Sequence, residues 1–374
     1  MKPRVLQLIG SFNNGGSERQ AVQLSRLLIA DETYDVRLAA MDRSGVLLDH
    51  VRTFYSDEIA EFAIESFFSV GFLKQARRCA KFINDNKIDI IHTHDFYTNV
   101  FGMAATFFAR HCRFISSKRE TGGMRTEMQD RIEKLAFSRS DAIVVNSDAV
   151  RSYLTQRTVT PEKIRVIYNG LDLDRFSRTA VRANVVTRLG LPDRAEIKFV
   201  TIVANLRHDV KNIPMLLRAA ARLENDDVHF VVAGEGELRP SLEAMAAELG
   251  VAERVHFIGR CDDVPSILGV SFAGVLTSDA EGFSNSLLEY MAAALPVVAT
   301  NVGGAAEIID VDVNGYLVEP NDDAALTEYL AKLAGDADRA KEFGQNGKAM
   351  VSERFSLDSQ LRNTLKLYDE VLGR

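Results

Sequence analysis

Short apolar runs alternate with amphipathic helical patterns along the whole chain. In the first half, the runs that predict strands are 4–9, 35–40, 88–94, 112–117, 141–146 and 164–170. A helical pattern from about Ser17 to Ile29 follows the first of them. Strands that alternate with helices are typical of βαβ units, in which a parallel sheet carries helices on both faces.

The same rhythm starts again in the second half. Strands are predicted at 197–206, 228–237, 254–259, 272–279, 296–304 and 314–320, with a helix from about Asn212 to Leu223. The segment 169–196 is polar and lacks a strand pattern, so we place a domain boundary near residue 178. The pattern predicts an α/β protein with two doubly wound, Rossmann-like domains, 1–178 and 179–356, facing across a cleft. A helix within 357–374 is expected to pack back on the first domain.

Composition changes this picture little. Of 374 residues, 46% are apolar and 26% are charged, as in soluble globular proteins. No run approaches the roughly 18 apolar residues of a spanning helix, and no N-terminal signal is visible. Cys79, Cys112 and Cys261 show neither metal-ligand nor disulfide spacing, which favours a reducing cytosol. We expect a cytoplasmic protein that is soluble or peripheral on the inner face of the membrane.

The net charge of −7 is unevenly distributed, with +4 up to residue 178 and −11 beyond it. Two basic stretches, 72–82 and 109–125, are interleaved with aromatic residues. A solvated face explains them, and a patch for anionic lipid or a phosphate-bearing acceptor is the alternative. Nucleic acid is not an expected partner, because the domain is only mildly basic and has no nucleic-acid motif.

The loop 10–20 places glycines where the first strand passes into the first helix. Backbone N–H groups at Gly15 and Gly16 near a helix start make an anion site without a cation. Ser17 is the expected N-cap, with Glu18 in the first turn. The loop is not Gly-x-Gly-x-x-Gly, so a plain tight turn is the alternative.

In the equivalent loop of the second half, Arg207 and Lys211 stand four residues apart before a helix. Cations are poorly placed at a helix start, so they indicate an anion held there. Arginine would supply a fork of donors and lysine a point charge. Two solvated charges are the alternative.

The stretch 281–289 carries an acid at each end, Glu281 and Glu289. A helix is predicted to begin at Ser284 or Asn285, which leaves Glu281 in a loop and Glu289 inside the helix. The two acids then contact opposite ends of one ligand, while the backbone of 284–286, including Ser286, meets an anion between them. Two surface acids are the alternative.

Two further strand ends carry weaker signals. His92, His94 and Asp95 close a first-half strand. His-x-His suggests a metal, but no third ligand lies at a useful spacing, so no metal is expected. We expect His94 to face the cleft and donate to a sugar or phosphate oxygen. The turn 303–304 is a double glycine that would let the backbone approach a diphosphate, a feature that many α/β loops share.

The chain resembles the retaining glycosyltransferases of family 4, which have the GT-B fold. An ordered series of motifs carries the resemblance: "GGSER", "IYNGLD..RF", "ANLR..VKN", "VVAGEGELR", "VHFIGR..DV", "EGFSNSLLEYMAAALPVVATNVGGAAEII" and "NGYLV". The resemblance implies that Arg207 and Lys211 grip the donor diphosphate, Glu281 contacts the donor sugar and Glu289 the ribose. It also implies that the loop of Gly15 and Gly16 closes over donor phosphates and acceptor, and that Arg260 lies near the base.

The chain departs from the family pattern at one strand end. Many members carry a histidine after the strand that here reads "CRFISSKRE", where Lys118, Arg119 or Glu120 stands instead. We place Arg119 on the acceptor or sugar side, together with Glu18 and His94. A smaller departure is Ala306, where proline is common in the family.

The resemblance implies transfer of a hexose-type sugar with retention, from a nucleotide-diphosphate sugar to a glycan or lipid-linked acceptor. A UDP-sugar is favoured over a GDP-sugar, and the expected role is cell-envelope or extracellular polysaccharide synthesis. No cofactor is expected, and Arg207 and Lys211 would replace a metal ion. Alternatives are a sugar-nucleotide 2-epimerase of GT-B fold and a non-catalytic nucleotide-sugar-binding protein. A NAD enzyme is disfavoured, since no dinucleotide fingerprint follows any strand.

Overall fold

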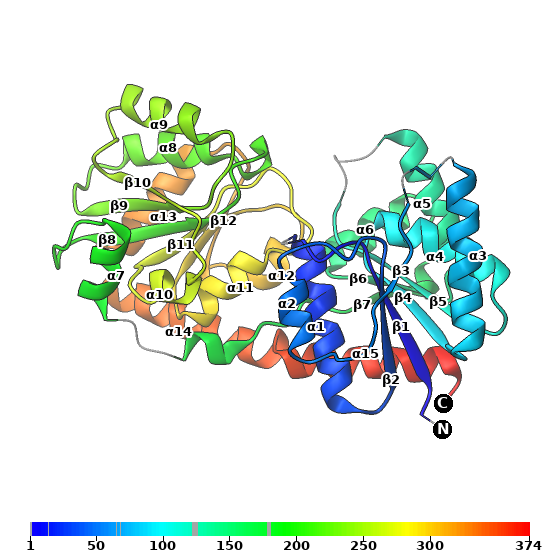
Figure 1. Ribbon diagram of the computed structural model, residues 1–374. Helices are drawn as coiled ribbons and strands as arrows, with labels where there is room; N and C mark the ends of the chain where they lie inside the picture. Colours follow the sequence, from blue (N-terminus) through cyan, green and yellow to red (C-terminus); the bar gives the residue numbers. More distant parts are fainter. Residues whose placement is uncertain (1, 14, 65, 68, 122–125, 178–180) are drawn as a thin grey trace. The chain divides into compact units, whose positions relative to one another are not determined.

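The computed structural model describes residues 2–13, 15–64, 66–67, 69–121, 126–177 and 181–374. The chain divides into two compact units, residues 1–169 with 357–374 and residues 170–356. Each unit is built on one parallel β-sheet with helices around it (Figure 1). The prediction of two Rossmann-like α/β domains is therefore confirmed.

The first unit holds a seven-stranded sheet in the order β3-β2-β1-β4-β5-β6-β7. Its strands are β1 (Arg4–Ile9), β2 (Asp35–Ala40), β3 (Ala60–Glu61), β4 (Ile90–Thr93), β5 (Arg113–Lys118), β6 (Ala142–Val145) and β7 (Ile164–Val166). Its helices are α1 (Gly16–Asp31), α2 (Leu48–Arg52), α3 (Val70–Asp85), α4 (Phe96–Phe108), α5 (Glu127–Arg139), α6 (Asp148–Gln156), the 3-10 turn η1 (Pro161–Lys163) and α15 (Leu357–Leu372).

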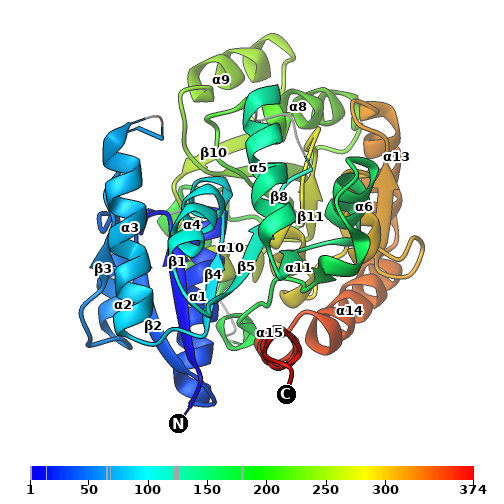
Figure 2. The same cartoon turned by 90° about the vertical axis from the view of Figure 1, so that its right-hand side faces the viewer.

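Alternate side chains of β1 explain why helices cover both faces of this sheet. Val5 and Ile9 are buried in a core with α1, whereas Leu6 and Leu8 are buried in a core with α3 and α4. Successive side chains of a strand point to opposite faces, so an apolar run needs cover on both sides. Figures 1 and 2 show α1 on one face of the sheet and α3 with α4 on the other.

The second unit holds a six-stranded sheet in the order β10-β9-β8-β11-β12-β13. Its strands are β8 (Lys198–Val203), β9 (Val228–Ala233), β10 (Val255–Gly259), β11 (Ala273–Leu276), β12 (Val297–Thr300) and β13 (Gly315–Val318). Its helices are η2 (Leu173–Phe176), α7 (Arg182–Leu189), η3 (Asp209–Lys211), α8 (Ile213–Arg222), α9 (Arg239–Glu248), α10 (Val264–Leu268), α11 (Asn285–Ala292), α12 (Ala305–Ile308), α13 (Asp323–Gly335) and α14 (Ala337–Arg354). Strand order reverses between β1 and β4 in one sheet and between β8 and β11 in the other, which marks the ligand-binding positions of such folds.

The C-terminal helix α15 belongs to the first unit. Leu367 and Tyr368 are buried in the same core as α1. The Tyr368 hydroxyl accepts a hydrogen bond from Gln7 Nε2 at 2.8 Å, and Tyr34 donates to Asp369 Oδ1 at 2.7 Å. These contacts hold the end of the chain on the first sheet.

The division between the units falls between Asn169 and Gly170, not near residue 178, which itself lies outside the described residues. The Leu171 N–H donates to the Phe355 carbonyl oxygen at 2.8 Å, and Leu171 forms an isolated bridge with Ser356. These contacts join the segment after Asn169 to the second unit. Contacts over so few residues produce no periodic pattern of hydrophobic residues in the sequence. For this reason the sequence pattern placed the domain boundary several residues too late.

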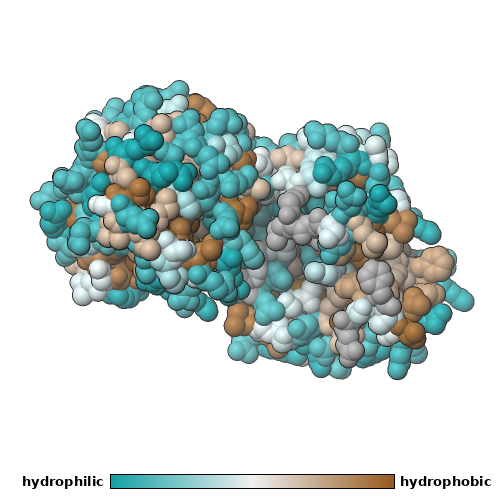
Figure 3. All heavy atoms as spheres, turned by 90° about the horizontal axis from the view of Figure 1, so that it is seen from above, coloured by the Kyte–Doolittle hydropathy of each residue, from teal (hydrophilic) through white to brown (hydrophobic). Residues whose placement is uncertain are grey.

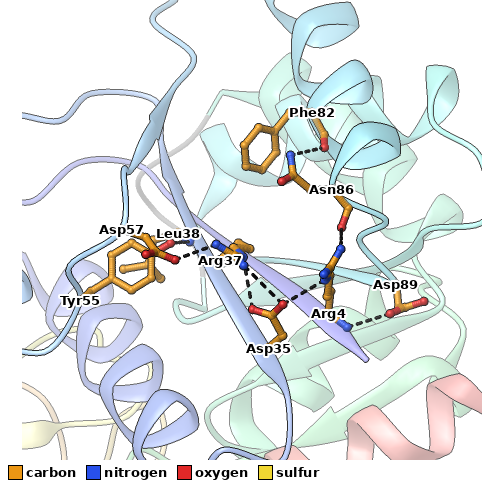
Figure 4. A network of polar contacts seen from close by, with 9 residues as sticks. All are labelled: Arg4, Asp35, Arg37, Leu38, Tyr55, Asp57, Phe82, Asn86 and Asp89. Atoms are coloured by element: carbon orange, nitrogen blue, oxygen red, sulfur yellow. Dashed lines mark hydrogen bonds and ion pairs between the residues drawn. The ribbon is translucent and has the colours of Figure 1, made fainter. Parts of the chain in front are cut away.

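A polar network ties the amino ends of the first strands together (Figure 4). Arg4 Nε pairs with Asp35 Oδ2 at 2.9 Å, its Nη1 donates to the Asn86 carbonyl oxygen at 2.7 Å, and its N–H donates to Asp89 Oδ2 at 2.7 Å. Asp35 also pairs with Arg37 Nε at 3.2 Å. This edge of the sheet is therefore cross-linked by paired charges. Among the described helices, none is long and apolar enough to span a bilayer.

Candidate functional site

The loop after β8 fixes the backbone around Lys211. The Lys211 carbonyl oxygen accepts a hydrogen bond from Thr277 Oγ1 at 2.8 Å, which ties the loop to the end of β11. The next residue, Asn212, is left-handed (φ +43°), and its side chain caps α8 by accepting from the Met215 N–H at 3.2 Å. Since strand order reverses between β8 and β11, Lys211 stands where ligands of such sheets bind.

The ammonium group of Lys211 pairs with the carboxylate of Glu281. Lys211 Nζ lies 2.5 Å from Glu281 Oε1, and the two side chains are only 20% and 14% exposed. Ser278 Oγ donates to the same oxygen at 2.8 Å. The two predicted residues are thus brought together, and charge-assisted hydrogen bonds orient the carboxylate. Sequence reasoning predicted neither the pairing nor Ser278.

A double-glycine turn after β12 supports the loop of Glu281. The Gly304 N–H donates to the Gly282 carbonyl oxygen at 2.8 Å. Gly303 has φ +55°, and a Cβ at this position would collide with the carbonyl oxygen of Glu281. Both the backbone conformation and the lack of space require glycine here.

Helix α11 begins at Asn285, as predicted, and places Glu289 about one turn inside. Ser284 caps the helix, since its Oγ accepts from the Leu287 N–H at 3.5 Å and lies 3.0 Å from Ser286 Oγ. The first N–H groups of a helix lack intrahelical partners and carry the positive end of its dipole. Glu289 is half-buried, as are Asn285 and Ser286.

Two other predicted cations lie on the surface of the second unit. Arg207 is exposed, and no carboxylate among the described residues pairs with it. Arg260 follows the edge strand β10, and its Nε pairs with Asp262 Oδ1 at 2.8 Å. Among the residues that the structure describes, Arg207 therefore has no carboxylate partner, whereas the Arg260 side chain is held in a local ion pair.

Sequence reasoning missed a polar cluster around Asn212. Asn212 Nδ2 donates to Asp279 Oδ1 and to Asn321 Oδ1, each at 2.8 Å. Asp279 and Asn321 follow the ends of β11 and β13. Both residues follow apolar runs in the sequence. Because the carboxyl ends of parallel strands lie at one edge of a sheet, these positions could have predicted that the two side chains lie close together.

In the first unit, α1 begins at Gly16 with Gly15 as its N-cap, so the prediction of Ser17 as the cap is wrong. The Glu18 carboxylate occupies the space beside Gly15 where a Cβ would lie, and it accepts from its own N–H. Among the described residues, no side chain makes a capping hydrogen bond at the start of α1. Burial raises the pKa of Glu18 against this hydrogen bond, and the charge of Asp95 raises it further.

The structure corrects our expectation for His94. The ring is 1% exposed, and its Nε2 lies 2.8 Å from Gln7 Oε1, so Nε2 carries the proton and donates within the core. Gln7 is turned this way because its Nε2 donates to the Tyr368 hydroxyl. The remaining atom, His94 Nδ1, is an acceptor without a partner among the described residues. Burial, with the charges of His92 and Arg119, lowers the pKa of His94 well below 6.5, which keeps it neutral.

Lys118 is the first of the three residues that stand where many members of the resembled family carry a histidine, and its contacts are structural. It is buried and pairs with Glu133 at 2.7 Å and with Glu120 at 3.1 Å. Arg119 Nη1 instead donates to Asn169 Oδ1 at 2.8 Å. Burial lowers the pKa of Arg119 to about 10, against the charges of nearby carboxylates, so it stays charged at neutral pH.

These first-unit residues lie at the carboxyl ends of neighbouring strands. His94 and Asp95 follow β4, Arg119 follows β5, and the loop of Gly15 follows β1. Asp95 caps α4 by accepting from the Thr98 N–H at 2.9 Å, and a Cβ on Gly10 would lie 2.8 Å from Asp95 Oδ2. The structure thus brings the predicted residues of this unit to one edge of its sheet.

A hollow of about 440 Å³ lies at the opposite edge of the first sheet. Its charges are paired, Lys2 with Glu32 at 3.7 Å and Arg4 with Asp35 at 2.9 Å. Ligands of open α/β sheets bind at the carboxyl ends of strands, so this hollow is not the candidate site. Within the part of the chain that the structure describes, no group of three or more His, Cys, Asp or Glu residues could hold a metal ion.

Both halves of the chain match models of known protein families. Residues 191–350 match "Glycosyl transferases group 1", and residues 14–175 match "Glycosyltransferase Family 4". The two matched segments together span most of the chain.

Two curated relatives and one solved structure match over most of the chain. The UDP-Gal:alpha-D-GlcNAc-diphosphoundecaprenol alpha-1,3-galactosyltransferase of Escherichia coli is 26% identical over 341 residues, which are 86% of this chain and 85% of that protein. The N-acetylgalactosamine-N,N'-diacetylbacillosaminyl-diphospho-undecaprenol 4-alpha-N-acetylgalactosaminyltransferase of Campylobacter jejuni is 26% identical over 372 residues, 96% of this chain and 97% of that protein. The crystal structure of Anabaena Alr3699/HepE in complex with UDP has a TM-score of 0.87 at 21% identity, covering 98% of this chain and 100% of that chain.

Proposed function

Because the chain belongs to the group 1 glycosyltransferases and has their GT-B fold, we propose that it transfers a sugar, with retention of configuration, from a nucleotide-diphosphate sugar to a glycan or lipid-linked acceptor. The observation that carries the proposal is the Lys211–Glu281 pair where strand order reverses in the second sheet. The pair lies in the loops that lead into α8 and α11, whose first turns attract anions.

A UDP-sugar is the proposed donor, with a GDP-sugar next. The name of the Escherichia coli relative specifies UDP-Gal, and the Anabaena structure holds UDP. We assign the diphosphate to Lys211, Arg207 and the first turn of α11, the sugar to Glu281, and the ribose to Glu289. We assign Gly15 and Gly16, with Glu18, His94 and Arg119, to the acceptor or sugar side of the reaction.

The proposed reaction exchanges one bond at the anomeric carbon. The bond to the diphosphate oxygen breaks, the acceptor hydroxyl oxygen bonds to the same face of the sugar, and the leaving phosphate takes the hydroxyl proton. Cations and helix N–H groups that face the leaving phosphate lower the barrier, because negative charge develops there. We propose that Lys211 and Arg207 serve in place of a metal ion, so that chelators leave the rate unchanged.

The proposed acceptor is lipid-linked, in envelope or extracellular polysaccharide synthesis at the cytoplasmic face of the membrane. Both curated relatives are named for diphosphoundecaprenol-linked acceptors. On α3, Arg77, Arg78 and Lys81 are exposed, and Leu73 and Phe107 are exposed on α3 and α4. Figure 3 shows hydrophobic residues among hydrophilic ones on the surface of the first unit. Neutralising the three cations should abolish binding to anionic liposomes, and a parent protein that does not bind them contradicts this contact.

A thermal-shift panel with UDP, GDP, ADP and their sugars tests the donor. A ligand at 100 times its dissociation constant adds about 2.7 kcal/mol to stability. In a domain of this size this raises the melting temperature by several degrees. One nucleotide should stand out, and a panel without any shift contradicts the proposal.

Product analysis separates the proposal from its alternatives. A 2-epimerase converts the nucleotide sugar alone into its isomer, whereas a transferase releases nucleotide diphosphate. A binding protein shows a thermal shift but no turnover with any acceptor. The anomeric coupling constant of the product, measured by NMR, decides between retention and inversion.

A further inference from the structure

The side chain of Asn212 joins three loops at the carboxyl edge of the second sheet. Asn212 directly follows Lys211, at the end of the loop after β8, and is only 8% exposed. Its Nδ2 donates to Asp279 Oδ1, after β11, and to Asn321 Oδ1, after β13, each at 2.8 Å. These two bonds use both protons of the amide, so the donors of Asn212 are engaged within the protein.

The orientation of this amide is fixed by the helix that follows it. Asn212 Oδ1 accepts from the Met215 N–H at 3.2 Å and so caps α8, which turns Nδ2 toward the two other loops. The backbone of Asn212 is left-handed, with φ +43° and ψ +48°. Asparagine adopts this conformation more readily than most residues with a side chain. A substitute for Asn212 therefore needs a left-handed backbone, an acceptor for the cap and two donors.

Two further hydrogen bonds hold the loop of Lys211 to the end of β11. The Asp279 N–H donates to the Val210 carbonyl oxygen at 2.8 Å, and Thr277 Oγ1 donates to the Lys211 carbonyl oxygen at 2.8 Å. Together with the Asn212 amide, they fix the backbone on both sides of Lys211. Moving Lys211 away from β11 breaks at least one of these bonds.

The partner of Lys211 is anchored at the same strand end. Ser278, just after β11, donates from Oγ to Glu281 Oε1 at 2.8 Å, and its carbonyl oxygen accepts from Thr300 Oγ1 at 2.6 Å. Asn212 ties the Lys211 side of the pair to this point. A charge lowers a reaction barrier most when it is held in place beforehand, because no reorganisation is then needed during the reaction.

We propose that Asn212 is a positioning residue, which sets the place of the Lys211 ammonium group through its hydrogen bonds to Asp279 and Asn321. The proposal rests on the proposed function and deepens it, since Lys211 is assigned there to the donor diphosphate. Asn212 acts through Lys211 rather than on the donor, because its own amide is engaged in the protein. A displacement of about 1 Å at a reacting site lowers the rate by about 100-fold.

Asn212→Asp tests the contact with Asp279. The substitution keeps the size, the cap acceptor and the tolerance for a left-handed backbone, but it places a carboxylate against Asp279. Asn321 is exposed and can turn its amide to donate to the new carboxylate, so the contact with Asp279 is the one that is lost. Adding Asp279→Asn reverses the polarity of this contact, because the new amide donates to the carboxylate at position 212.

Asp336→Asn is the matched control. Asp336 is exposed, belongs to the same unit and caps α14 by accepting from the Arg339 N–H at 3.0 Å. The control therefore exchanges the same two side-chain types at a helix cap far along the chain from Lys211, and neither kcat nor KM should change. Turnover is measured as nucleotide diphosphate released from the donor that the thermal-shift panel identifies.

We expect Asn212→Asp to lower kcat by about 10–100-fold with a smaller change in KM, and added Asp279→Asn to restore most of the rate. Lys211→Met provides the background for the decisive comparison. If Asn212 acts through Lys211, Asn212→Asp lowers the rate no further in that background, because residues that act as one unit are not additive. A residue that only stabilises the fold would lower the rate by the same factor in both backgrounds.

A readout without turnover separates this proposal from the proposed function. NMR of lysine-labelled protein reports the ε-ammonium group of Lys211, and the signal that disappears in Lys211→Met identifies it. We expect this signal to move toward that of a free lysine in Asn212→Asp, to return with Asp279→Asn, and to stay in place in Asp336→Asn. A parent protein that turns over no nucleotide sugar counts against the proposed function, and the Lys211 signal still decides the positioning role.

Three results would overturn the positioning role of Asn212. These are a kcat of Asn212→Asp within about threefold of the parent, an equal loss in the Lys211→Met background, and a Lys211 signal that Asn212→Asp leaves unchanged. If the melting temperature shows that Asn212→Asp does not fold, Asn321→Gly takes its place in each comparison. Glycine suits the left-handed backbone at this position (φ +65°) and removes one acceptor of Asn212 Nδ2, so the same three results decide.

Discussion

Replacing Lys211 with methionine tests the proposed function at its centre. The substitution keeps the length of the side chain but removes the ammonium group that lies 2.5 Å from Glu281 Oε1. Loss of one preorganised charge facing a leaving group lowers kcat by about 10²–10³-fold, which corresponds to about 2.7–4 kcal/mol. Because both side chains are mostly buried, solvent screens the pair only in part, and the loss of the Lys211 partner of Glu281 lowers the free energy of unfolding by about 1–3 kcal/mol.

A second substitution separates the effect on rate from the effect on stability. Glu281→Gln in the Lys211→Met background removes the carboxylate charge that Lys211 had paired and keeps an acceptor for Ser278 Oγ, which donates to Glu281 at 2.8 Å. We expect the double variant to regain most of the lost stability and none of the lost rate. Release of nucleotide diphosphate from the donor chosen by the thermal-shift panel measures the rate, and urea unfolding measures the stability.

Lys332→Met is the matched control for these variants. Lys332 Nζ pairs with Glu328 Oε1 at 2.7 Å on the exposed face of α13. Exposed pairs of this kind contribute little, because solvent screens them, so the stability should hardly change and the rate should not change at all. Turnover of Lys211→Met within about threefold of the parent would refute the reasoning, since that is under 1 kcal/mol of barrier. Full recovery of rate in the double variant would show that Lys211 is only a structural partner.

Three further predictions concern the supports of the two sites. Gly303→Ala should lower the affinity for the nucleotide sugar far more than Gly190→Ala does. Both glycines have positive φ, but only at Gly303 would the new Cβ collide with a neighbour, the carbonyl oxygen of Glu281. Equal affinities of the two variants in a nucleotide-sugar titration would contradict this prediction. Stability should fall as pH decreases below 6.5, because burial lowers the pKa of His92 to about 3 and that of His94 well below 6.5, so only the unfolded chain binds these protons. The expected loss is about 1.4 kcal/mol per pH unit for each ring, and equal urea midpoints at pH 7.5 and 5.5 would exclude it. Tyr368→Phe should cost about 1–3 kcal/mol in urea unfolding, since Gln7 and His92 both lose their partner in the core, and an unchanged midpoint would show that another group replaces the hydroxyl.

The fold was predictable because its signals are local. An apolar run such as 198–203 indicates a buried strand, and the glycines and polar residues that follow it mark the strand end where ligands bind. The start of α11 was also local, because Ser284 stands directly before an apolar helix. The displaced domain boundary shows the limit: the contact of Leu171 with Phe355 joins residues far apart in the sequence and leaves no periodic pattern.

The chemistry of the site depends on contacts that no local pattern contains. Which atom of His94 stays open depends on Gln7, and the orientation of Gln7 depends on a tyrosine 361 positions further along the chain. A strand-end histidine is equally compatible with a donor and with an acceptor until that tyrosine is placed, so the sequence pattern could not establish which ring nitrogen of His94 is held within the core. The same holds for Lys211 and Glu281, which are 70 positions apart in the sequence. The sequence therefore predicted each of them as a separate ligand contact and did not predict their pairing. Pairing makes them one unit, and for that reason the double variant, rather than either single one, decides what Lys211 does.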